Sequence, residues 1–236
     1  MHRQRSFRHK QSNDILKRND NQTMVNTTSR GLSVSRNMAI DNSTADICLI
    51  ADDDEIFVEN VCKLVGDVYN RFPDIDVIIF KISNFREKFH GKIKKLKKID
   101  TLKVSSQQIS FRKKSVEGIR FDVNLGAGTP NGAGEENKFL LDCKRNGLKI
   151  MYFPLPIAEV IEDSSSTWFN GYDERYFYNR GRTTRYIYGF MFALVYAVFF
   201  VTVHKKDFKG MSPIKALKYI VKGILKNDIG KQERIK

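Results

Sequence analysis

The sequence predicts an α/β fold in which short buried strands alternate with amphipathic helices. Apolar runs of strand length occur at residues 47–51, 77–80 and 150–153. Between them, residues 56–71 and 135–146 carry apolar side chains at helical spacing. Strands and helices that alternate in this way build a central sheet with helices on both of its faces.

Length and composition indicate one domain with appendages. The chain has 236 residues, of which 41% are apolar, and this share is sufficient to bury a core. Its formal net charge is +14. A charge of this sign and size points to an anionic partner, such as a membrane surface, a nucleic acid or a phosphorylated substrate.

The cysteines and histidines exclude several kinds of site. The four histidines are far apart in the sequence, which argues against a histidine metal site or a catalytic triad. The three cysteines lack metal-type spacing and are typical of reduced cysteines in a cytosolic protein. No secretory signal is expected, because residues 1–20 are polar and basic.

The most informative motif is a run of three aspartates, Asp52, Asp53 and Asp54, directly after the first predicted strand. Ligands of open α/β sheets bind at the carboxyl ends of strands. Asp52 and Asp54, two residues apart, suit a hard divalent cation such as Mg²⁺ or Mn²⁺. The alternative is an acidic cap of the helix predicted over residues 56–71.

A second acidic pair, Glu135 and Glu136, opens the helix that follows a glycine-rich loop at residues 126–134. Helix capping alone can explain it, since helix N-termini stabilise carboxylates. Together, however, the two acidic sites suggest a division of roles. One would hold a metal diphosphate, and the other would take a proton from an attacking hydroxyl group.

The C-terminal region predicts membrane-associated helices. Residues 186–203 form an uncharged run of 18 residues, which is the lower limit for a membrane span; the alternative is a buried or interfacial helix. A helix is expected to begin at Ser212-Pro213, with an apolar stripe between lysines. Such a helix lies on anionic membranes or packs on its own domain.

Taken in order, the motifs resemble those of the inverting family 2 glycosyltransferases, which have the GT-A fold, a Rossmann-like fold for nucleotide-diphospho-sugar transfer. The resemblance covers about residues 29–155, and its motifs lie at 31–40 (GLSVSRNMAI), 49–55 (LIADDDE), 134–139 (GEENKF) and 147–154 (GLKIMYFP).

The resemblance implies a metal-dependent transferase that uses Mn²⁺ or Mg²⁺. It implies metal binding by Asp52 and Asp54 and donor binding by Arg36, Asp52 and Asp53. Arg36 can instead form a structural ion pair. Glu136 would be the catalytic base in the place where the family usually has aspartate.

The implied substrates are a nucleotide-diphospho-sugar donor and a glycan or lipid-linked acceptor, as in bacterial-type surface polysaccharide or glycan assembly. Nucleic acid is not an expected partner. The implied location is the cytoplasmic face of a membrane, with peripheral or single-pass attachment.

The chain also departs from the family pattern. Residues 1–28 are basic and expected to be mostly disordered, so they offer neither of the two strands that open the family's sheet. Residues 29–185 therefore form a partial GT-A domain, followed by the tail at 186–236. No Gln-x-x-Arg-Trp motif is found, which favours transfer of single sugars. The alternatives are an inactive truncated transferase, or a basic protein that binds membranes or nucleic acid.

Overall fold

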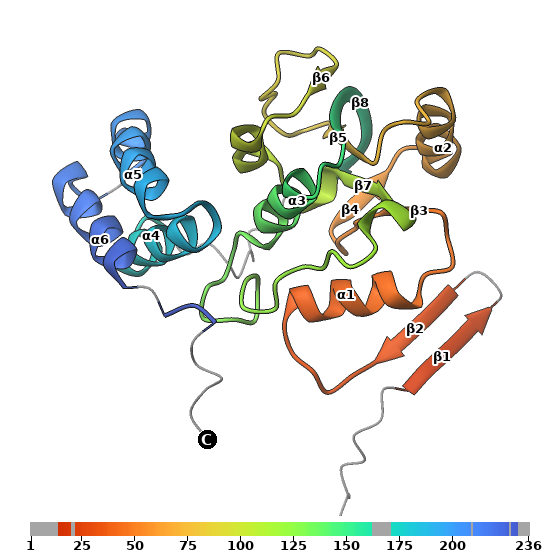
Figure 1. The fold of residues 1–236 in the computed structure, drawn as a ribbon, viewed down its shortest axis with the longest axis horizontal. Coiled ribbons are helices and arrows are strands. Elements are labelled where there is room, and N and C mark those ends of the chain that lie inside the picture. The colour runs from red at the N-terminus through yellow and green to blue at the C-terminus, as the bar shows by residue number, and fades with distance from the viewer. Residues whose placement is uncertain (1–13, 20–21, 162–170, 209, 227, 231–236) are drawn as a thin grey trace, which may run out of the picture.

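The structure is a computed structural model that describes residues 14–19, 22–161, 171–208, 210–226 and 228–230. It consists of an N-terminal hairpin, a mixed α/β domain and a C-terminal group of three helices (Figure 1). The predicted α/β class is confirmed. The expectation of disorder for residues 1–13 lies outside the described residues.

The hairpin corrects the expectation of disorder for part of residues 1–28. Strand β1 (Asp14–Asn19) pairs antiparallel with β2 (Gln22–Asn26), and Ile15 lies opposite Val25. The two strands form a sheet of their own, separate from the main sheet. Polar residues dominate both strands and hide the alternation typical of a half-buried strand, so the sequence pattern did not predict them.

The main sheet has six strands, and their order is β3-β7-β5-β8-β4, with β6 also paired to β8. Only β5 and β8 run parallel among the pairs of this sheet that the structure describes. The strands are β3 (Ile47–Leu49), β4 (Glu55–Phe57), β5 (Val77–Ile82), β6 (Lys94–Lys95), β7 (Ile109–Arg112) and β8 (Ile150–Val160).

Strand β8 continues past Pro154, where the sequence predicted that it would stop. Its register against β5 shifts at this point: Ile79 lies opposite Tyr152, whereas Lys81 lies opposite Pro156. Proline is tolerated where ladder pairing is interrupted, because the missing N–H group has no partner to lose there. Beyond the irregularity, β8 pairs with β4.

Helices cover both faces of the sheet, as predicted. Alternate residues of β5 enter two separate cores: Val77 and Ile79 face one, and Ile78 and Phe80 face the other. Helices α1 (Leu32–Asn42) and α3 (Glu135–Arg145) contribute to the first core, and α2 (Val61–Arg71) contributes to the second. Three short 3-10 helices lie between β6 and α3, at Lys98–Lys103, Ser106–Gln108 and Lys114–Val116.

The C-terminal group contains α4 (Glu174–Tyr188), α5 (Phe190–His204) and α6 (Pro213–Leu225). Gly189, with φ +91°, divides the uncharged run at 186–203 between α4 and α5. Among the described residues, no helix combines the length and the apolar character that crossing a bilayer requires. The predicted boundary at residue 185 falls inside α4.

Helix α6 begins as predicted, since the Ser212 side chain accepts a hydrogen bond from the Lys215 backbone N–H. Its apolar residues Ala216, Ile220 and Ile224 are buried in a core shared with α4 and α5. The apolar stripe of α6 is therefore used inside the protein, which is the packing alternative that the sequence left open.

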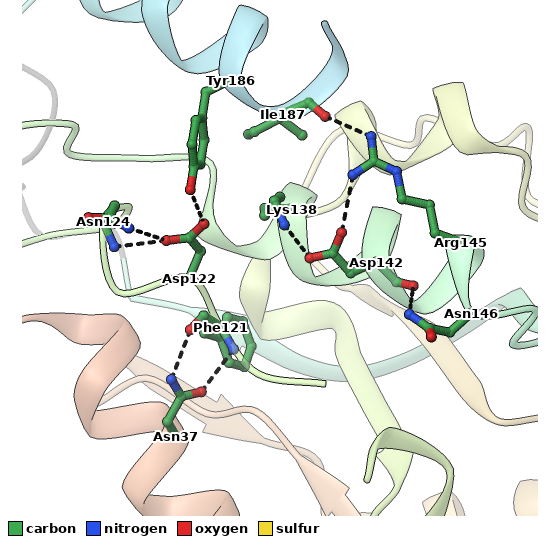
Figure 2. A network of polar contacts seen from close by, with 10 residues as sticks. All are labelled: Asn37, Phe121, Asp122, Asn124, Lys138, Asp142, Arg145, Asn146, Tyr186 and Ile187. Atoms are coloured by element: carbon green, nitrogen blue, oxygen red, sulfur yellow. Dashed lines mark hydrogen bonds and ion pairs between the residues drawn. The ribbon is translucent and has the colours of Figure 1, made fainter. Parts of the chain in front are cut away.

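Polar contacts join α4 to the α/β domain (Figure 2). Tyr186 donates a hydrogen bond of 2.6 Å to Asp122, and Arg145 of α3 donates one of 3.2 Å to the Ile187 carbonyl. Ile187 is also buried in a small core with Leu125 and Leu141 of that domain. The helices thus dock on the sheet domain through α4.

Candidate functional site

The three aspartates lie in the turn between β3 and β4. Glu55 is the first residue of β4, and the next helix, α2, begins only at Val61. Helix capping therefore does not explain the aspartates. The turn is fixed against the end of β8, since the Asp54 carbonyl accepts a hydrogen bond of 2.8 Å from the Ile161 N–H.

Asp52, Asp54 and Glu55 form an acidic cluster. One carboxylate oxygen of each lies within 4.8 Å of those of the other two. Asp54 Oδ1 and Glu55 Oε2 are buried and accept no hydrogen bond from any residue that the structure describes. Burial, together with the charges of Asp52 and Asp54, raises the pKa of Glu55 to about 7.

This donor set fits a hard divalent cation. Oxygen ligands in this number suit Mg²⁺ or Mn²⁺, and the two unsatisfied buried oxygens are the atoms that a cation would engage. Asp53, by contrast, is exposed and is not part of the cluster. The structure therefore does not bring Asp53 into the site with its neighbours.

Arg36 connects the acidic cluster to the second acidic pair. Its Nη2 lies 2.9 Å from Asp52 Oδ1, and its Nη1 lies 3.0 Å from Glu135 Oε1. The guanidinium group also packs over the Phe121 ring at 5.5 Å, and its side chain is only 7% exposed. Arg36 thus forms the structural ion pair that the sequence offered as its alternative role, with Asp52 and with Glu135, and donor binding by Arg36 stays a prediction.

Contacts between α1 and the loop at residues 121–127 hold Arg36 in place. The Ser33 hydroxyl donates to the Leu125 carbonyl at 2.7 Å, and the Leu32 N–H donates to the Ala127 carbonyl at 2.9 Å. Asn37 exchanges two hydrogen bonds with the backbone of Phe121 (Figure 2). Asn37 therefore anchors this loop to α1.

The two glutamates at the start of α3 have different surroundings. Glu135 is buried and paired with Arg36, whereas Glu136 is half-buried and lines a cavity. Gly126 makes room for the Glu135 carboxylate, because a Cβ atom at that position would lie 3.1 Å from the Glu135 carboxyl carbon. Burial and the neighbouring charge of Glu135 raise the pKa of Glu136 to about 8.

The cavity has a volume of about 760 Å³ and lies between the glycine-rich loop, the start of α3 and α4. Its charged and polar wall includes Lys88, Asn131, Glu136, Asn137, Asn179 and Arg180. The acidic cluster does not line it. Two neighbouring serines connect the cavity to the acidic cluster. Ser105 lines the cavity, and the next residue, Ser106, donates a hydrogen bond of 3.3 Å to Asp52.

Three residues of this site, Glu55, Glu135 and Ser106, were not assigned these places from the sequence. Glu55 carried a signal, because it directly follows the aspartates and closes the motif at residues 49–55, but no role was predicted for it. Glu135 was proposed with Glu136 as an acidic pair, and its pairing with Arg36 across 99 residues has no local signature. Ser106 has no signal in the sequence.

Comparisons with known proteins give similarity of structure only. No protein-family model and no curated protein matches the sequence. Staphylococcus aureus TarS matches with a TM-score of 0.47 and 13% identity, over 87% of this chain and 34% of that one. Residues 1–349 of TarS match with a TM-score of 0.45 and 14% identity, over 89% of this chain and 56% of that one.

A mannosyltransferase from Pyrobaculum calidifontis, solved with GDP-Man and Mn²⁺, matches with a TM-score of 0.40 and 11% identity, over 82% of this chain and 48% of that one. The chain thus spans between about a third and just over half of the length of these structures. The structural neighbours are glycosyltransferases, and the degree of similarity says nothing of the activity of this chain. The function proposed below depends on the residues of its own site.

Proposed function

We propose that this protein is a metal-dependent inverting glycosyltransferase, which moves a sugar from a nucleotide-diphospho-sugar to an acceptor hydroxyl group. The observation that supports this most is the chain of contacts from the acidic cluster through Arg36 to Glu135, directly beside Glu136 in the cavity wall. A cation-binding group and a candidate base thereby belong to one connected site.

The donor would bind at the acidic cluster, where Asp52, Asp54 and Glu55 would hold Mn²⁺ or Mg²⁺. A bound cation supplies positive charge that offsets the charge developing on the leaving diphosphate. Arg36 fixes the Asp52 carboxylate and adds a second positive charge near the diphosphate. Asp53 is exposed and lies outside the cluster, so its predicted contact with the donor would not involve the cation.

The acceptor would enter the cavity, where Glu136 would take the proton from its hydroxyl group. A raised pKa makes this carboxylate a stronger base than an ordinary glutamate, and general-base catalysis contributes about 10²–10⁴-fold to a rate. Attack from the cavity side, opposite the leaving diphosphate, would invert the anomeric carbon. The cavity can hold part of a glycan or of a lipid-linked glycan, as bacterial-type surface polysaccharide assembly would require.

The test is Mn²⁺ binding and donor hydrolysis in Asp54→Asn and Asp53→Asn. Asp54→Asn should abolish tight Mn²⁺ binding, measured by electron paramagnetic resonance with and without UDP or GDP, because it removes a ligand and a charge. Asp53→Asn removes the same charge at an exposed position and is the matched control. Equal Mn²⁺ affinity in Asp54→Asn and wild type would refute the metal assignment.

A further inference from the structure

Helix α5 is apolar on two opposite sides, and only one of them is used inside the protein. Its inner side buries Ala193, Ala197, Phe200 and Val201 against α4 and α6. The other side, named the outer α5 face, consists of Met191, Val195, Val198, Phe199 and Val203, all of them more than half exposed. Met191 and Val195 are 72% and 70% exposed.

An exposed face of this composition is unusual for a helix of a globular protein. Surface helices normally place charged and polar residues opposite the core. Residues 190–203 contain no charged residue at all. Contiguous apolar surface on a folded protein marks a place of interaction with another protein or a membrane.

The C-terminal helical group that carries the outer α5 face is strongly basic. Between residues 172 and 228 the sequence has eleven Lys and Arg residues against four Asp and Glu. The exposed side of α6 presents Lys215, Lys218, Lys222 and Lys226, and Lys205 and Lys206 follow α5. Three of the four acids are paired within the protein: Glu174 with Lys215, Asp207 with His204, and Asp228 with Arg182.

Charge complementarity favours an anionic membrane over a second copy of this chain as the partner of the outer α5 face. A second copy of this chain would bring two basic surfaces together, and juxtaposed like charges oppose association. Anionic lipid headgroups would pair with the lysines while the acyl chains take up the apolar side chains. The outer α5 face therefore fits the surface of an anionic membrane.

We propose that the outer α5 face inserts into the interfacial layer of an anionic membrane, with α5 parallel to the membrane plane. A helix of 15 residues is about 22 Å long, which is shorter than the roughly 30 Å hydrocarbon layer. In Figure 1, α5 and α6 lie at the end of the molecule that is far from the N-terminal hairpin. The sheet domain would therefore remain in solution, at the cytoplasmic face if the donor is a nucleotide sugar.

The membrane contact differs from the one that the sequence predicted. The apolar stripe of α6 is buried, so α6 would contribute its lysines and the exposed Ile214 and Leu225. The apolar contribution comes instead from α5. None of the residues of the outer α5 face lines the cavity or belongs to the acidic cluster.

Flotation of the full chain with vesicles tests this proposal. Wild-type protein should float with vesicles of phosphatidylcholine containing about one third phosphatidylglycerol, and high salt should weaken binding. The double variant Val195→Glu/Phe199→Glu should bind at least about tenfold more weakly, because it replaces apolar contacts with charges that the lipid repels. Ile93→Glu, at an exposed apolar position directly before β6 of the sheet domain, is the control for an added surface charge and should bind like wild type.

A second pair, Lys218→Glu/Lys222→Glu, should weaken binding to the anionic vesicles severalfold and reduce its salt dependence. The proposal is overturned if wild type does not float, or if Ile93→Glu loses binding as much as the double variant does. It is also overturned if wild type forms a dimer without lipid that Val195→Glu/Phe199→Glu disrupts, since a second copy would then occupy the face. Donor hydrolysis, measured on the same variants, tests the proposed function separately.

Discussion

At the scale of single residues, the neighbours Glu135 and Glu136 show how surroundings assign different roles to identical side chains. Glu135 is held at 3.0 Å by Arg36 and is buried. Glu136 lines the cavity, and the groups near its carboxylate include Glu135, which raises its pKa, and the cations Arg36 and Lys88. The pair therefore provides one structural carboxylate and one that is suited to accept a proton.

This difference predicts different effects for two matched substitutions. Glu136→Gln keeps the size of the side chain but cannot accept a proton, so turnover should fall by roughly 10²–10⁴-fold with donor affinity little changed. In wild type the base must be ionised, so turnover should rise as the pH increases from the ordinary glutamate range towards about 8.

Glu135→Gln should instead lower the midpoint of that pH profile, because it removes the negative charge that raises the pKa of Glu136. It should also destabilise the fold by about 1–3 kcal/mol, since Arg36 loses one of its two charged partners. Rate profiles against pH and thermal melts measure both effects. A severe loss of turnover in Glu135→Gln, with Glu136→Gln fully active, would show instead that Glu135 is the base and Glu136 is not.

At the scale of elements, the crossing of α4 and α6 depends on two glycines. A Cβ atom at Gly181 would lie 2.0 Å from the Ile220 carbonyl oxygen of α6. A Cβ atom at Gly223 would lie 2.0 Å from the Tyr178 carbonyl oxygen of α4. Each helix thus places its backbone directly against a glycine of the other, and no larger side chain fits at either position.

We therefore expect Gly181→Ala and Gly223→Ala to force α4 and α6 apart, at a cost of about 1–3 kcal/mol or more. Gly66→Ala is the control: Gly66 lies inside α2, and a Cβ atom there would have no neighbour within 4 Å, so alanine should stabilise by about 0.5–1 kcal/mol. Thermal melts measure the energies, and hydrogen exchange would locate the loss in α4–α6. Melting of Gly181→Ala at or above the wild-type temperature would contradict the close crossing.

At the scale of the whole molecule, the C-terminal helices are part of the folded unit. Ile187 and Ile229 share a core with Leu125 and Leu141, and Tyr186 bonds Asp122 (Figure 2). Helix α4 also supplies part of the cavity wall. The separate tail that the sequence predicted at residues 186–236 is therefore packed on the α/β domain.

Deletion of residues 186–236 should lower the melting temperature and promote aggregation, because it cuts α4 and exposes Leu125 and Leu141. Tyr186→Phe is the graded comparison: it removes only the hydrogen bond to Asp122 and should cost about 1 kcal/mol. Size-exclusion chromatography and thermal melts distinguish the two. If the truncated chain stays monomeric and melts at the wild-type temperature, residues 186–236 are not needed for the fold and the prediction is wrong.

What the sequence determined by itself are the features with local causes. Apolar runs predicted β3, β5 and the first part of β8, and helical spacing predicted α2, α3 and α6. The aspartates after β3 and the glutamates that open α3 were visible as the candidate chemistry. The local sequence pattern is sufficient to predict these features, because helices, strands and their ends depend mainly on residues that are near in sequence.

Only the tertiary structure decided which of these residues act together. Arg36 meets Asp52 and Glu135 because α1, the β3–β4 turn and α3 converge, and no spacing in the sequence encodes that meeting. The tertiary structure also decided which apolar side chains of the C-terminal helices are buried. Helix α6 buries its apolar stripe, whereas α5 leaves one apolar side exposed. Hydropathy measures how strongly a side chain avoids water, and packing alone determines which neighbour, protein or lipid, covers it.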